Sequence, residues 1–335
     1  MPEQKISEKR KEYIDALKVV ALMFVIALHT QRGVDVTDKC NNAVLFYLGR
    51  FSMPVFFMVN GTLILGKKEF NFPYYKKKIT GIIKVLFIWG CILGIYSYFM
   101  IDHSLKGMVK NAIKGMIAYH WVTSMWFFIT FGLIYTILLF CFKNIKANIK
   151  KVVCVLGMIC LAVDVASIIN IHRGGFFVQD HITQRLRLWT WMFYFCLGYY
   201  IDNIDLSDKA KRIAAVFIAP ISVACIYWQH YICYVKTGQI ESNYVYDNIL
   251  IMLWSICIFI FFKTNIRASH FFAKFAPISF GVFLLHGFFV DAFQLRAYPQ
   301  NPFESALMWI FLIAGCGILS WIFNKIPVVK KAFQY

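Results

Sequence analysis

Long runs of apolar residues recur along the whole chain, separated by short polar segments. Ten of these runs are 15 to 23 residues long. They cover 13–30, 43–65, 80–100, 125–142, 152–171, 186–201, 213–234, 248–262, 275–292 and 305–323. A helix of about 20 apolar residues crosses a hydrocarbon core of about 30 Å, and 186–201 and 248–262 are short by that measure. Because a helix satisfies its own backbone hydrogen bonds in lipid, the pattern predicts an all-α, polytopic membrane helical bundle of about ten transmembrane helices.

Composition supports lipid as the main solvent of the protein. Of the 335 residues, 60% are hydrophobic and 16% are charged, against about 25% charged in a typical globular protein. The 34 Phe, 18 Tyr and 9 Trp suit lipid-facing surfaces and membrane interfaces. No Gly/Ser-rich or Pro-rich linker divides the chain, so we expect one membrane domain over 1–335, with a short cytoplasmic segment, 1–12, ahead of the first run.

The net charge of +18 has an uneven distribution that predicts the topology. If the N-terminus is cytoplasmic, 23 Lys and Arg lie in inner segments and 10 lie in outer ones. Cytoplasmic loops of membrane proteins carry this excess, so we expect both termini in the cytoplasm. The same distribution removes the motive for a nucleic-acid partner.

One further apolar run, 108–120, carries Lys110 and Lys114. These charges make it a poor transmembrane segment, and we expect an interfacial or re-entrant helix there.

Three ionisable residues, Asp15, Lys18 and His29, interrupt the first predicted helix. At about 100° per residue, Lys18 and His29 differ by about 20° around the helix, and Asp15 lies within about 40° of His29. Intramembrane charges are costly, so an aligned set indicates a polar interior or a hydrated cavity. The alternative is a structural ion pair between Asp15 and Lys18, with His29 an interfacial residue.

The second predicted helix carries Arg50 in its outer third, followed by Pro54 and Asn60. Proline should kink this helix and free a backbone carbonyl. Arg50 either extends toward the membrane surface as an anchor or holds a carboxylate or an oxyanion inside, and we weigh these interpretations about equally.

Three more ionisable residues lie within later runs. Asp164 and Asp291 are single acids, each a candidate partner for Arg50 or His29, and His286 precedes Asp291 by five residues. Sequence alone does not pair them.

Five strings in order across residues 10–325 resemble the acyltransferase-3 family of bacterial integral-membrane O-acyltransferases. They are YIDALKVVALMFVIALH, FSMPVFFMVNGTLIL, HWVTSMWFFITFGLIY, LGYYI and SFGVFLLHG. The family pattern is a basic residue, ten intervening residues and a histidine, which here are Lys18 and His29. The basic residue is usually arginine, and lysine keeps the charge without the bidentate fork.

The resemblance implies transfer of an acyl group, often acetyl from acetyl-CoA, to hydroxyls of envelope glycans at the bacterial plasma membrane. Some members carry an extracytoplasmic hydrolase-like domain, and this chain has no length left for one. The expected partners are an acyl-CoA donor, a glycan acceptor and the lipid bilayer. We expect no tightly bound cofactor and no metal site, and the sequence does not indicate an oligomeric state.

We assign three residues to catalysis on these grounds. His29 would act as general base or transient acyl acceptor, Lys18 would attract the anionic donor, and Arg50 would orient the acceptor or stabilise the oxyanion. The residues assigned to substrate binding are Asp15, Asn60, Trp126, His286 and Asp291. Trp126 suits an aromatic belt at the membrane surface equally well.

Two polar segments outside the runs have open roles. The inner loop 67–78 carries Lys67, Lys68, Lys76, Lys77 and Lys78, which either bind the phosphates of coenzyme A or only fix topology, and we favour topology. The outer segment 172–187 is rich in His, Arg and Asp, and we favour a solvated loop over a glycan site.

A different function class also fits these residues. In a polysaccharide exporter or small-molecule transporter, Asp15, Lys18, His29, Arg50 and Asp291 would line a path without catalysing a reaction. Discontinuous helices and internal repeats would favour transport, and we find no clear repeat in the sequence.

Overall fold

The computed structural model describes residues 12–30, 44–117, 125–232, 245–266, 270–294, 299 and 301–330. These residues form helices and connecting turns, and none of them lies in a strand. The longer helices are α1 (Glu12–Ala27), α3 (Ser52–Leu65), α4 (Phe72–Ser97), α5 (Leu105–Met116), α6 (Trp126–Ala147), α7 (Ile149–His172), α8 (Leu188–Asn203), α9 (Asp208–Gln229), α10 (Ile249–Asn265), α12 (Ser279–Gln294) and α13 (Pro302–Lys325). Short elements are α2 (Val44–Leu48), η1 (Gly49–Phe51), η2 (Tyr98–Asp102), η4 (Val178–His181), η5 (Gln184–Leu186), α11 (His270–Phe275) and α14 (Pro327–Lys330).

The protein is all-helical, with six helices among the described residues that are long and apolar enough to cross a membrane. They are Val44–Leu65, Phe72–Ile101, Trp126–Ala147, Ile149–His172, Asp208–Ile232 and Pro302–Lys325. Two shorter apolar helices, Ile249–Asn265 and Ser279–Phe293, accompany them. Each of the ten predicted runs contains a helix, but the count of ten spans and the side of each terminus stay predictions.

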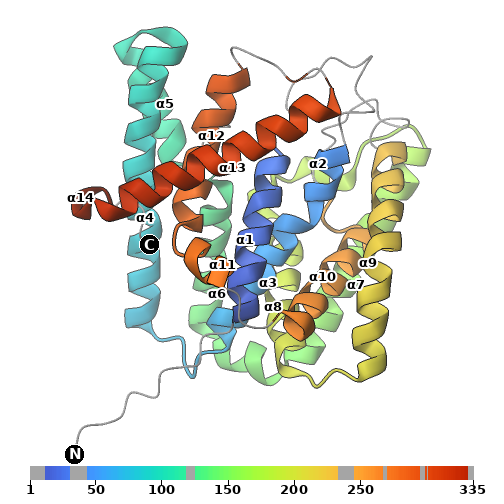
Figure 1. Cartoon of the computed structure of the whole chain (residues 1–335). Helices are drawn as coiled ribbons and strands as arrows, with labels where there is room; N and C mark the ends of the chain where they lie inside the picture. The colour runs from blue at the N-terminus through green and yellow to red at the C-terminus, as the bar shows by residue number, and fades with distance from the viewer. Residues whose placement is uncertain are drawn as a thin grey trace, which may run out of the picture.

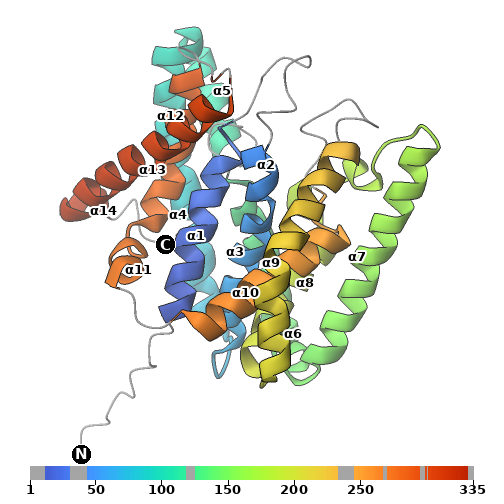
Figure 2. The ribbon, with the colours of Figure 1, turned by 45° about the vertical axis from the view of Figure 1, so that its right-hand side comes forward.

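Helices α1 and α3 lie in the middle of the bundle, and α7 and α13 lie on its outside (Figures 1 and 2). Ten of the 16 residues of α1 are buried, as are most residues of α3 and α8. By contrast, only three residues of α9 are buried, and large apolar side chains of α7, α9 and α13 are exposed. This inverted distribution is what a lipid-facing outer layer requires.

Helices α3 and α8 cross at van der Waals distance because glycines lie at their contact. A Cβ atom on Gly61 would lie 1.7 Å from the carbonyl oxygen of Phe195, and one on Gly198 would lie 2.1 Å from that of Met58. Small residues allow such close backbone approach in lipid, where packing drives helix association. The crossing fixes α3, which carries Asn60, against the centre of the bundle.

Helices α4 and α5 form an antiparallel pair at one edge of the molecule (Figure 1). Gly90 and Gly94 of α4 lie against the backbone of α5 at Ala112 and Met108. The turn between the helices includes His103, which has a left-handed φ of 49°. The part of 108–120 that the structure describes therefore packs along α4, and residues 118–124 lie outside the described residues.

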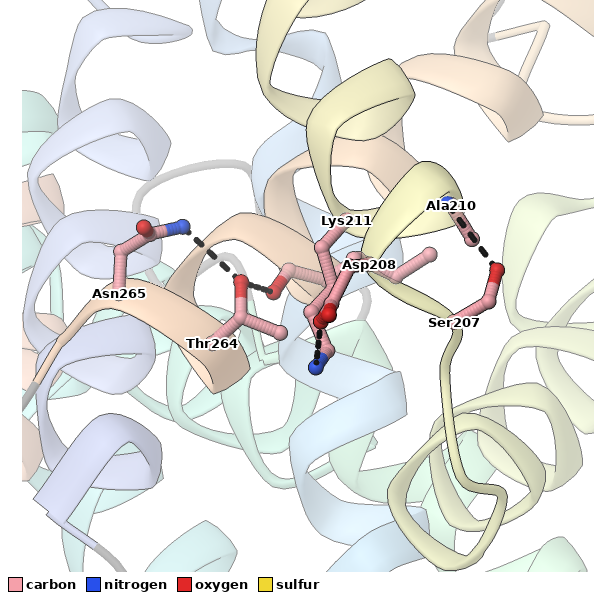
Figure 3. A network of polar contacts seen from close by, with 7 residues as sticks. Ser207, Asp208, Ala210, Lys211, Thr264 and Asn265 are labelled. Carbon is pink, nitrogen blue, oxygen red and sulfur yellow. Dashed lines mark hydrogen bonds and ion pairs between the residues drawn. The ribbon is translucent and has the colours of Figure 1, made fainter.

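Polar side chains mark the ends of several helices. Ser207 caps α9, since its Oγ accepts from the backbone N–H of Ala210 at 3.2 Å, and Asp208 pairs with Lys211 at 2.8 Å (Figure 3). The end of α10 lies nearby in the same view, where Asn265 donates to the hydroxyl of Thr264. Asn71, Ser104, Asn248 and Asn301 cap α4, α5, α10 and α13 in the same way.

Candidate functional site

A cavity of about 530 Å³ lies between α1, α3, α6 and the segment 276–283 at the start of α12. Its wall is mostly apolar and aromatic, with Lys18, Asn60 and Ser279 as its polar residues. The apolar lining residues are Leu22, Val25, Met53, Phe56, Leu63, Phe127, Ala276, Phe280 and Phe283. An apolar cavity with a few convergent polar groups is the usual form of a small-molecule site, and two predicted site residues border this one.

Positive charge gathers at the Lys18 end of the cavity. Lys18 is partly exposed, and its ammonium lies 3.8 Å from the carboxylate of Asp15, whose side chain is 10% exposed. Lys78 of α4 is close enough to Lys18 and Lys67 for their charges to repel its own. Lysines drawn from three segments therefore add positive charge at this end, which favours an anionic ligand there.

His29 lies just beyond α1, in a turn that continues the helix. The last helical residue is Ala27, and the N–H groups of His29 and Thr30 donate to the carbonyls of Ile26 and Ala27 at 2.9 and 3.3 Å. These i to i−3 bonds are tighter than α-helical ones, so the 100° step used to align His29 with Lys18 does not hold for the last residues. His29 is half-buried and is not among the residues that line the cavity.

The neighbour of His29 is His286 of α12. The two imidazole rings have centroids 5.1 Å apart and are tilted by 47°. His286 is fully buried, its Nδ1 contacts the backbone carbonyl of Phe283, and its Nε2 has no hydrogen-bond partner among the described residues. The structure thus brings two predicted site residues together. We call Lys18, His29, His286 and the cavity the α1–α12 site.

Aromatic rings separate the cavity from the two histidines. Phe283 lines the cavity, and its ring centroid lies 5.2 Å from that of His286. Phe127, which also lines the cavity, packs edge-on against Phe283 at 4.7 Å. Sequence reasoning missed both residues, because a phenylalanine in an apolar run carries no signal that distinguishes a cavity wall from a core.

Arg50 is almost fully buried beside the expected helix break and away from the cavity wall. It lies in the 3-10 turn η1, which interrupts the second predicted helix four residues before Pro54, in agreement with the predicted kink. Its guanidinium carbon lies 4.3 Å from the Phe46 ring centroid and 6.0 Å from that of Tyr246. This geometry is a cation–π contact. The interpretation of Arg50 as a surface anchor does not fit a side chain with 1% exposure.

The other predicted substrate-binding residues have different surroundings. Asn60 lines the cavity and donates to the carbonyl of Phe56 at 2.8 Å. Asp291 is buried and accepts a hydrogen bond of 2.6 Å from the Tyr96 hydroxyl. Trp126 begins α6 and packs against the ring of Trp191 at 5.1 Å, so it belongs to an internal aromatic stack.

A second group of buried polar residues lies between α7, α8 and α10. Asp164 accepts from the Asn248 amide at 3.1 Å and from the backbone N–H of Ile249 at 3.4 Å. Asp247 accepts from the Thr190 hydroxyl and, at 3.5 Å, from the Gln179 amide. Neither Asp164 nor Asp291 therefore directs its hydrogen bonds within the described residues to Arg50 or His29.

Arg187 completes this group, and it is 4% exposed. Its Nε donates to the carbonyl of Ile182 at 2.9 Å and its Nη2 to that of Gln179 at 2.6 Å. The expectation of a solvated loop is therefore wrong at Arg187 and at Gln179, which is 1% exposed. Burial raises the pKa of the Asp247 carboxyl, against the effect of the Thr190 hydrogen bond. We call Asp164, Gln179, Arg187, Asp247 and Asn248 the α7–α10 cluster.

Six membrane-length apolar helices around a partly polar interior define a polytopic α-helical membrane protein. A family model described as an acyltransferase domain matches residues 11–325. The chain belongs to the acyltransferase-3 family, and it is an acyltransferase. No curated protein and no solved structure matches it.

Proposed function

We propose that this membrane acyltransferase moves an acyl group, with acetyl as the first choice, from a cytoplasmic acyl-CoA to a hydroxyl of an envelope glycan in the bacterial plasma membrane. The observation that carries the proposal is the arrangement of the α1–α12 site. A cavity with a basic end leads to Phe283, and Phe283 contacts His286, which lies beside His29. A basic residue in the first half of α1 and a histidine just beyond its C-terminal end suit a donor and an acceptor that approach from opposite sides.

The donor end follows from the charges at Lys18. Coenzyme A carries phosphates on a nucleotide and a long, uncharged pantetheine arm that ends in the thioester. Lys18, with Lys67 and Lys78 nearby, attracts the phosphates, while the apolar wall between Leu22 and Phe283 accepts the arm. If the inner lysines only fixed the topology, Lys18 and Lys78 would not need to lie near each other.

The chemistry needs a group that takes a proton from the attacking hydroxyl. His29 accepts this proton, the hydroxyl oxygen attacks the thioester carbonyl, and a tetrahedral intermediate forms. The C–S bond then breaks as the new C–O ester bond is completed, and the proton returns from His29 to the thiolate to give free coenzyme A. In the two-step alternative, a His29 nitrogen attacks the thioester, the C–S bond breaks and the coenzyme A thiolate leaves; the hydroxyl then attacks the acyl-imidazole, the N–acyl bond breaks, and the hydroxyl proton goes to the freed imidazole.

Arg50 packs against Phe46 and Tyr246 and does not line the cavity, so we assign it no contact with the acyl carbon. Its charge, held 4.3 Å from the centroid of Phe46, is a fixed positive centre in the part of the bundle that we expect to face outward. In this proposal it attracts the polar acceptor or the oxyanion through space, with no direct contact to the donor.

The experiment uses the purified full chain in liposomes with acetyl-CoA and a soluble envelope-glycan acceptor. We expect free thiol to appear in step with acylated acceptor, and the H29A variant to lose about 100-fold or more in rate, the usual value of a general base. The matched control is H172A, because His172 is an exposed histidine at the end of α7.

Several outcomes would count against the proposal. Full activity in H29A would remove the catalytic role of His29. Transport of glycan without thiol release would favour the exporter class. Mass spectrometry of envelope glycans from cells with and without the protein then identifies the acyl unit and its position.

A further inference from the structure

The buried imidazole of His286 has one nitrogen bonded to its own helix and one nitrogen without a partner among the described residues. A backbone carbonyl only accepts hydrogen bonds, so the contact with Phe283 requires His286 Nδ1 to carry a proton and donate it. An imidazolium with no acid against it is costly to bury, so the ring is neutral and Nε2 holds a lone pair. This lone pair is fully buried and has no hydrogen-bond donor among the described residues.

Among the described residues, the His29 ring packs against the His286 ring, with the two ring centroids 5.1 Å apart. On its own helix, Asp291 directs its carboxylate to Tyr96 of α4, and Phe283 supplies an apolar ring on the cavity side. The two imidazole planes are tilted by 47°, so the rings do not stack face to face.

We propose that His286 is a positioning residue for His29. Its Nε2 accepts the N–H of His29, directly or through one water, during the acyl-transfer cycle. The bond selects one tautomer of His29 and turns its other nitrogen, which bears the lone pair, toward the reacting hydroxyl. This inference rests on the proposed function for its catalytic consequence, although the hydrogen bond itself does not.

His286 is held in place to accept a hydrogen bond from His29. The bond from Nδ1 to the Phe283 carbonyl, three residues earlier, locks the ring to its own helix, so that the distant nitrogen is held rigidly. A side chain that is held by one hydrogen bond and accepts a second one can orient a catalytic imidazole in this way.

Two substitutions by amide side chains, H286N and H286Q, test the roles of Nδ1 and Nε2 separately. In H286N the short side chain can still donate to the Phe283 carbonyl, as Nδ1 does, but nothing remains at the place of Nε2. In H286Q the longer side chain carries its carbonyl oxygen to about the place of Nε2 and can accept the N–H of His29. A structural role for His286 predicts that H286N is the better replacement, whereas a positioning role predicts that H286Q is.

The experiment measures kcat and donor KM for the full chain in liposomes. We expect H286N to lose about 100-fold in kcat with donor KM unchanged, and H286Q to stay within about tenfold of the wild type. Equal losses in both variants, or a better H286N, would overturn the inference.

A second readout does not need acyl transfer. The imidazole lone pair attacks a carbonyl carbon of diethyl pyrocarbonate, and peptide mass spectrometry gives the rate of modification at His29. We expect labelling of His29 to slow severalfold in H286N and to remain near the wild-type rate in H286Q, with His172 as the internal reference. An unchanged labelling rate in H286N would contradict the hydrogen bond, whereas absent acyl transfer in the wild type with the expected labelling would contradict only the proposed function.

Discussion

The molecule buries polar groups in two regions, and they differ in how these groups are satisfied. In the α7–α10 cluster, Asp164 and Asp247 each accept hydrogen bonds from named donors, and Arg187 donates to two backbone carbonyls. None of these three side chains lines the cavity of about 530 Å³ or the one of about 510 Å³ against α7 and α8. In the α1–α12 site, a cavity of about 530 Å³ adjoins Lys18, and a buried nitrogen of His286 has no partner among the described residues.

The comparison separates a structural polar group from a functional one. Burial is similar in both regions, since Arg187 is 4% exposed and His286 is 0% exposed. What differs is the hydrogen bonding: Nε2 of His286 has no partner among the described residues, and Phe283, which contacts the His286 ring, lines the cavity. A satisfied network stabilises one arrangement of the fold, whereas an unused lone pair can accept a hydrogen bond during the reaction.

We expect the largest effect from a substitution in the α7–α10 cluster, at Arg187. Replacing Arg187 with Met removes both donors and leaves the carbonyls of Gln179 and Ile182 buried. We expect a loss of about 3 kcal/mol in folding free energy, seen as a lower inactivation temperature in detergent, because unsatisfied buried groups cost about 1–3 kcal/mol each. The control is R173M, which alters an exposed arginine of the same loop.

Activity per folded molecule decides whether the α7–α10 cluster is structural. We expect R187M to keep kcat and donor KM within about threefold of the wild type. A normal inactivation temperature with a large loss of kcat would instead place Arg187 in the reaction, and the comparison would fail.

The sequence predicts much of the fold for a simple physical reason. Apolar runs of the length of a bilayer leave helices as the favoured structure, so the ten predicted runs all contain helices. The η1 break near Pro54 also follows from local chemistry. The burial of Gln179 and Arg187 does not, since a polar loop that folds back into the bundle has the same local sequence as a solvated one.

The site is predictable only in part. The Lys18 and His29 pattern points to α1, but the 3-10 turn after Ala27 changes the direction of His29. The pairing of His29 with His286 joins residues that are far apart in sequence, and no periodicity along one helix reports such a contact. The cavity wall is likewise a product of packing between four segments.

A smaller effect is expected at the donor end of the α1–α12 site. We expect Lys18→Met to raise donor KM about 30-fold with kcat within about threefold, as a hydrogen bond to a charged group contributes about 1.5–3 kcal/mol. Lys211→Met is the matched control, because Lys211 also pairs with an acid three residues earlier, at 2.8 Å, but lies away from the cavity.

The substitution Lys18→Arg tests whether a positive charge alone is enough at this position. Since a point charge attracts the donor phosphates, Lys18→Arg should keep donor KM within about threefold of the wild type, and a bidentate contact could lower it. An equal rise of KM in K18M and K211M would mean that the lysines act only through the overall surface charge.

The smallest expected effect concerns the acyl group itself. Phe127 lines the cavity and packs against Phe283, so Phe127→Ala should enlarge the part of the cavity that holds the acyl chain. We expect the preference for butyryl-CoA over acetyl-CoA, as a ratio of kcat/KM values, to rise about tenfold, because one methylene in an apolar pocket changes binding by about 1–3 kcal/mol. Phe70→Ala is the control, since Phe70 is a buried aromatic residue that packs with Phe142 and does not line the cavity. A ratio that moves equally in both variants would indicate general loosening of the bundle, and an unchanged ratio in F127A would mean that the acyl group does not reach this aromatic pair.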